Sequence, residues 1–487
     1  MQNLYNKLIE LSESRQYPFH MPGHKRNTDS TPLKGAFQCD ITEIDDFDNL
    51  HDEEGIILEA EERANRLYGA HRTYFSVNGS TAGVLAAVSA SVKNGGTILA
   101  ARGSHKSFYH AAFLRNLNIK YLPNKTDNEL KIPGVYSKDD VENYLDDSVE
   151  AVFITSPTYE GKCSDIAGIA RICHDRNIPL IVDAAHGAHF GFGKEYDKKY
   201  DKEQEYSSVP QSAVKQGADI VIHSIHKTLP SMTQTALIHI SDYKGLADEV
   251  KKYLRIYQTS SPSYVLMASI DLCMEELEKN SDSFIKNLLD YRNAISVKAS
   301  GLHNIAIAGA DIIDDPAKVV IFDRTGTMTG KQIYGILRDE YRLQLEMAGD
   351  KIALAILSGW DSEEGIERLI QAVSEIDEKI QETKINTESS VNNITDGKKS
   401  AEYPVAALKL SEAWDKTSEE TLLQEAKGKI SGDFINLYPP GIPLIVPGEV
   451  FSEELIEEIC GYLDEDLNVQ GVVSKPGGTG YFVRTLK

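Results

Sequence analysis

A lysine lies in the segment Ser224-Ile225-His226-Lys227-Thr228, directly after the mostly apolar run 218–223. An amine at the end of a buried strand can form a Schiff base with an aldehyde, and the neighbouring hydroxyl and imidazole groups can hold a phosphate. Pyridoxal 5'-phosphate (PLP) carries both an aldehyde and a phosphate. The segment therefore indicates a PLP site, with an unreactive surface lysine as the alternative, and other strand ends must distinguish the two.

The elements that must position this lysine lie between about residues 72 and 240, where short apolar runs alternate with helical patterns. Strands without polar alternation, separated by helices, are typical of a parallel sheet covered on both faces. One intervening helix begins at the capping-box pattern Ser137-x-x-Asp140, and another covers 166–176. The expected strands are 73–77, 97–100, 151–154, 180–182, 220–222 and 236–240.

Ligands of open parallel sheets bind beyond the carboxyl ends of the strands, so each strand end is informative. The first strand is followed by Gly79-Ser80-Thr81, which opens a helix whose free N–H groups suit a phosphate; a tightly packed helix cap is the alternative. The second strand is followed by His105, which could lie flat on an aromatic ring or be a capping or solvated histidine.

Two further strand ends complete the pattern. Thr158 follows 151–154 and could reach a ring substituent or the substrate, although turn chemistry alone would explain it. Asp183 directly follows a buried strand and needs a partner, because an unpaired buried carboxylate is costly. A protonated pyridine nitrogen is such a partner and would keep the ring an effective electron sink, whereas a structural salt bridge is the alternative. One helix and one strand separate Asp183 from Lys227, which favours the functional interpretation.

These motifs, taken in order, match the fold type I PLP enzymes over about residues 72–240. The predicted fold class is α/β: a large domain of the aspartate-aminotransferase-like fold with a mainly parallel sheet, a small α/β domain and a C-terminal α+β domain. The expected segments are an N-terminal segment at the active site and dimer interface (1–70), the PLP-binding large domain (71–300), the small domain (301–383), a polar linker (384–400) and the C-terminal domain (401–487).

Composition limits the remaining possibilities. The 487 residues suffice for two or three domains, and 41% hydrophobic with 26% charged residues describes a globular protein. Five scattered cysteines without a Cys-x-x-Cys pair argue against a disulfide framework or a metal site and favour the cytoplasm. No apolar run could span a membrane, and the first residues lack a signal-peptide core. A net charge of −23 disfavours nucleic acid and anionic membranes and is compatible with a cationic small molecule.

The chain resembles the bacterial Orn/Lys/Arg decarboxylases, the fold type I basic amino-acid decarboxylases, in their short form without the N-terminal wing domain. The resemblance covers nearly the whole chain apart from the linker. Its motifs are His20-Met21-Pro22-Gly23-His24-Lys25, Asp40-Ile41-Thr42-Glu43, Ser104-His105-Lys106-Ser107, Asp183-Ala184-Ala185-His186-Gly187-Ala188-His189, Ser224 to Pro230, Thr259-Ser260-Ser261-Pro262-Ser263-Tyr264, and Tyr438 to Glu449. One departure is Ala184, where short-form relatives more often have glutamate.

The resemblance implies a role for each matched residue. Lys227 is the Schiff-base lysine, Asp183 pairs with the pyridine nitrogen, and His105 stacks on the ring; these three are the expected catalytic residues. His186 contacts the ring's 3-hydroxyl, and Glu449 lies near the distal cation of the substrate. Thr259 and Ser260 contact the phosphate of the neighbouring subunit, which implies a homodimer or a higher homo-oligomer. The remaining expected cofactor contacts are Gly79, Ser80, Thr81, Thr158, Ser224 and His226.

The function that the resemblance implies is decarboxylation of a basic amino acid to the corresponding amine and CO2, as in polyamine biosynthesis. Arginine ranks first as the substrate, then lysine, then ornithine. The alternatives are another fold type I reaction, such as aminotransfer or aldol cleavage, and a non-catalytic regulatory homologue. The retained Lys227, Asp183 and His105 argue against the regulator.

Overall fold

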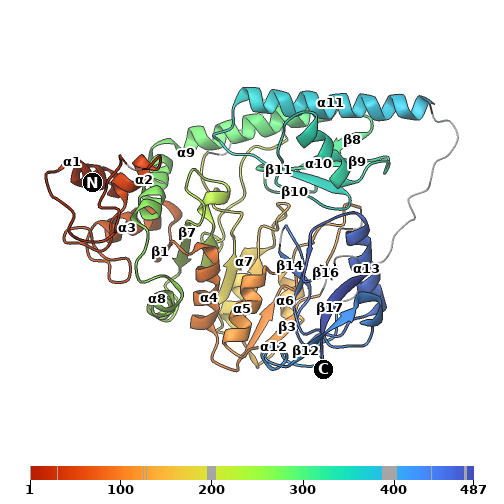
Figure 1. The fold of residues 1–487 in the computed structure, drawn as a ribbon, viewed down its shortest axis with the longest axis horizontal. Coiled ribbons are helices and arrows are strands. Elements are labelled where there is room, and N and C mark those ends of the chain that lie inside the picture. The colour runs from red at the N-terminus through yellow and green to blue at the C-terminus, as the bar shows by residue number, and fades with distance from the viewer. Residues whose placement is uncertain are drawn as a thin grey trace.

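The chain forms a large unit around a seven-stranded sheet, a smaller unit around a four-stranded sheet and a C-terminal unit, shown together in Figure 1. The structure is a computed structural model. It describes residues 2–29, 31–123, 125–127, 129–194, 205–386, 403–439, 441–475 and 480–487, with the side chains of 382–386 left out. Within these ranges, no helix combines the length and the apolar character needed to cross a membrane.

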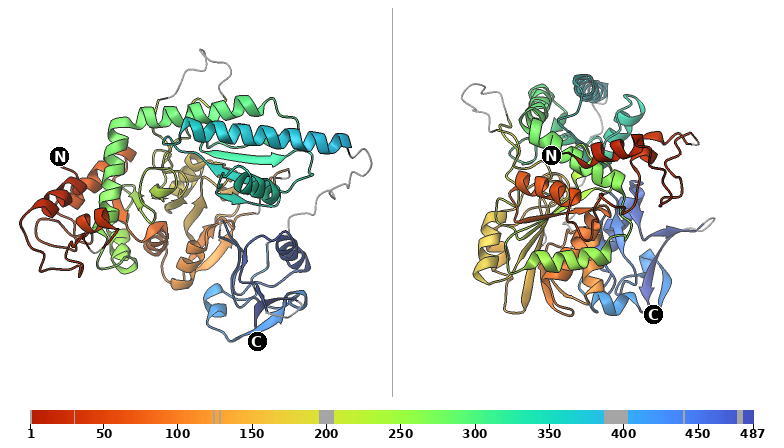
Figure 2. Two further views of the ribbon diagram at one scale, coloured as in Figure 1. Left: turned by 45° about the horizontal axis from the view of Figure 1, so that its top comes forward. Right: turned by 90° about the vertical axis from the view of Figure 1, so that its left-hand side faces the viewer.

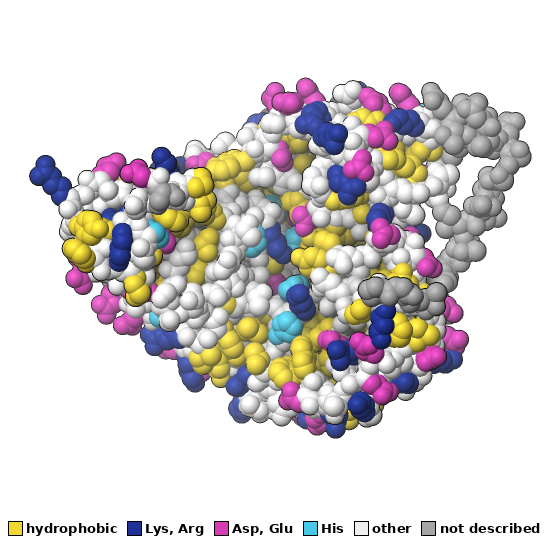
Figure 3. All heavy atoms as spheres, viewed as in Figure 1, with side chains coloured by type: hydrophobic (Ala, Val, Ile, Leu, Met, Phe, Trp, Pro, Cys, Tyr) yellow, Lys and Arg dark blue, Asp and Glu magenta, His cyan; other side chains and the backbone are white. Residues whose placement is uncertain are grey.

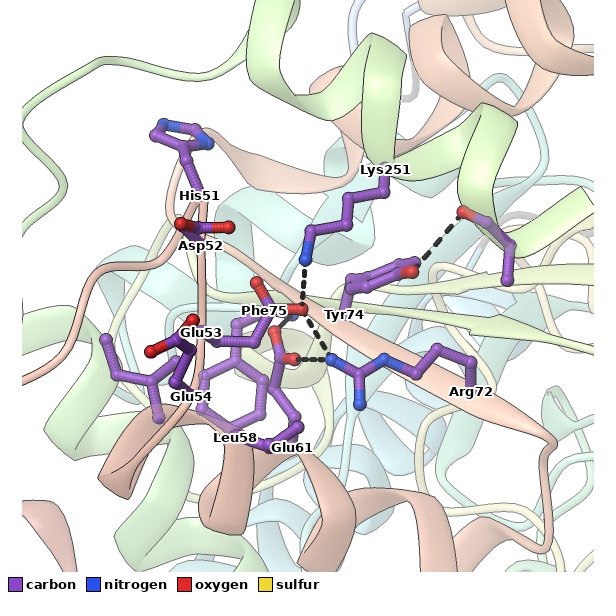
Figure 4. A network of polar contacts seen from close by, with 12 residues as sticks. His51, Asp52, Glu53, Glu54, Leu58, Glu61, Arg72, Tyr74, Phe75 and Lys251 are labelled. Carbon is purple, nitrogen blue, oxygen red and sulfur yellow. Dashed lines mark hydrogen bonds and ion pairs between the residues drawn. The ribbon is translucent and has the colours of Figure 1, made fainter.

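The N-terminal part contributes three helices: α1 (Leu4–Glu13), α2 (Lys34–Cys39) and α3 (Ile56–Tyr68). A buried charge network fastens α3 to the large sheet (Figure 4). Arg72 Nη2 donates to Glu53 Oε1 at 2.6 Å and to Glu61 Oε2 at 2.9 Å, and Lys251 Nζ donates to Glu53 Oε1 at 2.9 Å. Glu61 also accepts the N–H of Phe75, so it joins the helix to the backbone of the first strand.

The seven-stranded sheet has the order β1-β7-β6-β5-β4-β2-β3. Its strands are β1 (Arg72–Ser76), β2 (Thr97–Ala100), β3 (Asn118–Tyr121), β4 (Val149–Thr155), β5 (Leu180–Asp183), β6 (Ile220–His223) and β7 (Ala236–Ile240). Six strands run in one direction, whereas β7 is antiparallel to both β1 and β6. The expected mainly parallel sheet is therefore confirmed, with β7 as its antiparallel member. The connection from β6 to β7 holds only the 3-10 turn η1 (Ile225–Lys227), and a parallel return would need a longer crossover.

Helices cover both faces of this sheet: α4 (Gly79–Ser91), α5 (Lys106–Leu114), α6 (Lys138–Glu142), α7 (Ile166–Asp175) and α8 (Leu246–Tyr257). The capping box of Ser137 and Asp140 and the helix from residue 166 are both confirmed. Alternate residues of the strands enter two separate cores, Phe153 among those facing α4 and α5 and Val152 among those facing α7. The fully buried sheet positions explain why the strands lack polar alternation.

The smaller unit is reached through the long helix α9 (Tyr264–Ala299), which lies beside α11 (Glu363–Asn386) in Figure 2. Its sheet has the order β10-β11-β9-β8 with antiparallel neighbours, and α10 (Gly330–Asp339) packs against it. The strands are β8 (Ile305–Ile307), β9 (Lys318–Asp323), β10 (Met347–Ala348) and β11 (Ile352–Ile356). Residues 384–386, expected in the linker, end α11; residues 387–400 lie outside the described ranges.

The C-terminal unit combines two three-stranded antiparallel sheets, β12-β17-β16 and β14-β13-β15, with short helices. Apolar residues of both sheets and of α13 share one core. The elements are α12 (Leu410–Trp414), β12 (Ser418–Leu422), η2 (Leu423–Glu425), β13 (Ile435–Leu437), β14 (Ile442–Ile445), α13 (Glu453–Asp464), β15 (Val469–Gln470), β16 (Val473–Ser474) and β17 (Tyr481–Leu486).

Candidate active site

The carboxyl ends of β1, β2, β4, β5 and β6 meet at one edge of the large sheet, because these strands are parallel. The register places Thr155 of β4 opposite Asp183 of β5, and Asp183 opposite Ile222 of β6. Lys227 follows β6 in η1. Figure 3 shows histidine, basic and acidic side chains gathered in a hollow at the centre of one face of the molecule. The predicted strand ends are therefore brought together at one edge.

The amine of Lys227 lies near three polar side chains, those of His186, Asp183 and Glu346. Its Nζ is 2.9 Å from Nε2 of His186, and Nδ1 of that ring is 2.8 Å from Nζ of Lys318. Burial lowers the pKa of Lys227, while the charges of Asp183 and Glu346 act to raise it. A lowered pKa increases the fraction of neutral amine, which is the nucleophilic form.

Asp183 lies near Lys227 and is almost fully buried. Its Oδ1 accepts the N–H of Ala185 at 3.1 Å. Burial raises the pKa of this carboxyl, whereas the charge of Lys227 and the backbone hydrogen bond act to lower it. A buried carboxylate with so few hydrogen bonds suits a cationic ring nitrogen as an additional partner.

His105 is the N-cap of α5, and it lies close enough to Lys227 for the charge of that lysine to affect its pKa. Burial, followed by the charge of Lys227, lowers the pKa of His105 to about 4, so the ring is neutral near pH 7. Its Nδ1 accepts the N–H of Ser107 at 3.2 Å. The C-terminal unit approaches here: the N–H of Lys106 donates to the carbonyl of Gly441 at 3.3 Å. A neutral ring that is fixed at one nitrogen is suited to stacking.

Several groups form a cradle suited to a phosphate. Gly79 opens α4 with a φ of +72°, and the preceding Asn78 provides no side-chain cap to this helix. Within the described residues, the hydroxyls of Ser224 and Thr228 are buried without a hydrogen-bond partner. Ser80 and Thr81 lie in the first turn of α4. An uncapped helix start and unpaired buried hydroxyls fit a phosphate, and Asp183 fits a pyridinium, so the residues present fit PLP.

The other expected cofactor contacts have described partners within the chain. His226 Nδ1 lies 2.9 Å from the carbonyl of Thr235, and Thr158 Oγ1 accepts the N–H of Lys162 at 3.2 Å. Thr259 and Ser260 are exposed, and the N–H of Thr259 donates to Asn78 Oδ1 at 3.2 Å. Their contact with a neighbouring subunit stays a prediction.

Glu449 is buried in an ion pair with Arg102. Its side chain is 1% exposed, and its Oε2 accepts Arg102 Nη2 at 2.9 Å and the N–H of Val446 at 2.8 Å. Burial raises the pKa of this carboxyl, while Arg102 acts to lower it. The carboxylate therefore belongs to an ion pair between the C-terminal unit and the end of β2, and its expected contact with the substrate stays a prediction.

Two charged residues at the site were missed by sequence reasoning. Lys318, the first residue of β9, is fully buried and contacts His186. Glu346 is exposed, hydrogen-bonds the hydroxyl of Tyr159 and is close enough to influence both Lys318 and Lys227. A lysine at the start of an otherwise apolar buried strand was the available signal for Lys318.

The fold defines the class of protein. The constitutive lysine decarboxylase of Escherichia coli superposes with a TM-score of 0.78 at 19% identity, covering 99% of this chain and 82% of that one. At this identity the likeness concerns the fold, and it confirms the predicted α/β architecture of PLP fold type I.

The sequence then gives the family. The Orn/Lys/Arg decarboxylase major domain matches residues 2–395, and the C-terminal domain of the same family matches 398–484. The chain therefore belongs to the Orn/Lys/Arg decarboxylase family and is an amino-acid decarboxylase. It is similar to the arginine decarboxylase of Bacillus subtilis, at 28% identity over 99% of this chain and 97% of that protein. It is also similar to the uncharacterized protein YaaO of the same organism, at 32% identity over 96% and 95% of the two chains.

Proposed function

We propose that this protein is a PLP-dependent decarboxylase that removes the α-carboxyl group of a basic amino acid as CO2. Arginine ranks first as the substrate, then lysine, then ornithine. The observation that carries the proposal is the half-buried amine of Lys227, which lies beside Asp183 and the His186 ring at the carboxyl edge of the sheet. The first place of arginine is supported by the full-length similarity to an arginine decarboxylase.

Each of these residues would contact a different part of the cofactor. Lys227 would attach it covalently, Asp183 would keep a proton on the ring nitrogen, and His105 would cover one face of the ring. The phosphate would lie against the start of α4, with Gly79, Ser80, Thr81, Ser224 and His226 around it. When bound, PLP supplies the electron sink that accepts the bonding pair as CO2 leaves.

The chain's own groups would handle the proton that replaces the carboxyl group. Burial lowers the pKa of Lys227, so its amine, once the substrate has released it, could take up a proton and give it back. His105 is neutral near pH 7 and would contribute surface rather than charge. Their roles explain why both are held by packing and by hydrogen bonds rather than exposed in loops.

The proposal extends to the assembly and its setting. We propose a homodimer or a higher homo-oligomer in which Thr259 and Ser260 contact the phosphate of the neighbouring subunit, and a cytoplasmic role in polyamine formation. The exposure of both side chains supports the first part, because they are available to a second subunit.

The test begins with cofactor binding. The purified chain is mixed with PLP, reduced with borohydride and digested, and mass spectrometry locates the modified lysine. We expect modification at Lys227 and none in Lys227→Ala, whereas Lys244→Ala, which removes an exposed lysine, should behave as the wild type. A colourless protein without trapped cofactor would instead support the regulatory homologue.

The substrate is then identified with a panel of amino acids. Release of CO2 with agmatine, cadaverine or putrescine would identify arginine, lysine or ornithine respectively. A keto acid product without CO2 would refute decarboxylation and support aminotransfer.

A further inference from the structure

The small unit and the C-terminal unit meet at the end of helix α13. Nζ of Lys331, in the first turn of α10, donates to Asp466 Oδ2 at 2.6 Å. The neighbouring Gly330 donates its N–H to the carbonyl of Asp350 at 2.7 Å, which places Asp350 at the same contact. Glu465 is the C-cap of α13 and directly precedes Asp466. The turn between β10 and β11, which holds Asp350, therefore lies beside the end of α13.

Two carboxyl groups face each other across this contact, those of Asp350 and Glu465. Their side chains lie within hydrogen-bonding reach of each other. Within the described part of the chain, Oε2 of Glu465 is buried without a hydrogen-bond partner. Two ionised carboxylates can only accept hydrogen bonds and repel each other, whereas a protonated carboxyl can donate to an ionised one. The contact is therefore favourable only when this carboxyl pair holds a proton.

Other charged and titratable groups at this contact have partners of their own. Lys331 is bonded to the residue after the helix, and the amine of Lys351 donates to the carbonyl of Glu129 at 3.1 Å. Within α13, the hydroxyl of Tyr462 donates to Glu458 Oε1 at 2.8 Å. These bonds leave the solvent as the source of the proton that the carboxyl pair needs.

The pKa of Glu465 gives the direction of the pH dependence. Burial, followed by the charge of Asp350 and the hydrogen bond with it, raises this pKa to about 7. A glutamate without such a partner has a pKa of about 4.3. Because the formed contact binds the proton more tightly than the separated groups do, proton binding stabilises the contact. This stabilisation is fully present below the ordinary glutamate pKa and is lost as the pH rises through the raised value.

We propose that Asp350 and Glu465 make a proton-dependent contact between the small unit and the C-terminal unit, which forms in acid and opens as the pH rises toward neutrality. One proton controls the contact, so its opening equilibrium should increase about tenfold per pH unit between the two limits. With limits of about 4.3 and about 7, the increase is about 40-fold between pH 5 and pH 7 and less than about twofold between pH 7 and pH 8.

The carboxyl pair joins two units that both reach the candidate active site. On the small unit, Glu346 directly precedes β10 and acts on the pKa of Lys227. On the C-terminal unit, the carbonyl of Gly441 accepts the N–H of Lys106, next to His105. Opening of the pair therefore removes one of the contacts that hold these two parts of the site relative to each other.

Hydrogen–deuterium exchange with mass spectrometry tests the contact in the full-length chain. Each rate is divided by the intrinsic rate of the amide, which itself depends on pH, and EDTA is present throughout. Peptides covering 348–352 and 462–469 should lose protection by up to about 40-fold between pH 5 and pH 7, while those of α9 should keep theirs. The measurement needs neither cofactor nor substrate, so its outcome is independent of the proposed function.

Two variants remove the need for a proton. In Glu465→Gln and in Asp350→Asn, an amide can donate to the remaining carboxylate at every pH. The same peptides should then change by less than about twofold between pH 5 and pH 7. Asp464→Asn is the matched control, because it removes an exposed carboxyl from the same end of α13 and should keep the full pH dependence. Either of the first two variants suffices if the other does not fold.

Any of three results would overturn the proposal. Protection that does not change with pH in the wild type would show that the contact is indifferent to protons. A wild-type pH dependence in Glu465→Gln or Asp350→Asn would place the titrating group elsewhere. Protection at pH 5 that is present without EDTA and lost with it would show that a metal cation, rather than a proton, joins the two carboxyl groups.

Discussion

Arginine 102 should hold the C-terminal unit on the large sheet, and its removal is the sharpest test of the role that the structure gives to Glu449. The guanidinium is 2% exposed and donates to the carboxylate of Glu449 at 2.9 Å, the carbonyl of Pro443 at 2.8 Å and the hydroxyl of Tyr109 at 2.9 Å. Arg102→Met keeps much of the side-chain volume while it removes all of these donors.

The size of the effect follows from what is left behind. Glu449 would remain buried beside unpaired acceptors, and removing one partner of a buried ion pair costs about 3–5 kcal/mol. This corresponds to a more than roughly 100-fold increase in the opening equilibrium of the contact. In Arg102→Met/Glu449→Met no uncompensated carboxylate remains, so the loss should be smaller than in the single variant.

Hydrogen–deuterium exchange with mass spectrometry measures this opening locally. Peptides covering β13, β14 and the end of β2 should exchange faster in Arg102→Met, while those of α9 and α11 should not change. Lys331→Met is the matched control, because Lys331 also contacts the C-terminal unit, through Asp466 at 2.6 Å, but in an exposed pair. Such a pair contributes about 0–1 kcal/mol, so exchange should be almost unaffected.

Two results would refute this reasoning. Unchanged exchange of β13 and β14 in Arg102→Met would show that the ion pair does not hold the contact. Alternatively, Glu449→Gln with unchanged exchange but a large rise in KM for the amino acid would support the substrate contact that the sequence resemblance implies for Glu449.

Three other predictions concern the scaffold. Asp377→Ala should destabilise the protein by about 3 kcal/mol in urea unfolding, because Asp377 accepts backbone N–H groups at the start of β8, whereas the exposed Glu378→Ala should not. Gly83→Ala should cost about 1–3 kcal/mol in the same assay, since its Cβ would lie 2.9 Å from Ile238 Cγ1. Burial acts to raise the pKa of Asp48, but hydrogen bonds from backbone N–H groups outweigh it, and the net pKa is lowered. The ionised carboxylate of Asp48 therefore stabilises the folded protein above the usual carboxyl pKa, and this contribution is lost as the pH falls through the lowered pKa. Thermal unfolding of Asp48→Asn should therefore decline less on acidification, and an unaltered acid profile would contradict this.

The alternation of buried strands and helices was sufficient to predict the large sheet, apart from two strands. Strand β3 was missed because it lies at the edge of the sheet and its four residues are only partly buried, so its apolar signal is weak. The direction of β7 was missed because a buried apolar run looks the same in either orientation. The edge position of β3 and the direction of β7 both depend on which strands lie beside them, and the residues of a single strand do not specify this.

The site was predictable to the extent that it belongs to the large sheet. Asp183 and Lys227 each follow a parallel strand, and the topology alone brings such positions to one edge. The same argument applies to His105, which follows the parallel strand β2. Glu449 was placed by resemblance alone, and a buried arginine 347 positions earlier in the chain cannot be recognised as its partner from spacing.

Lys318 shows why the remaining part of the site could not be read from motifs. It comes from the antiparallel sheet of the small unit, and its distance from His186 depends on how that unit packs on the large one, where the N–H groups of Asp314 and Asp315 donate to the carbonyl of Gly161. The segments on either side of Lys227 therefore set its position, while the charge around it comes both from Asp183 of the large sheet and from Glu346 of the small unit. A change that moves Glu346 away from Lys227 should lower the pKa of Lys227 without touching any strand end of the large sheet.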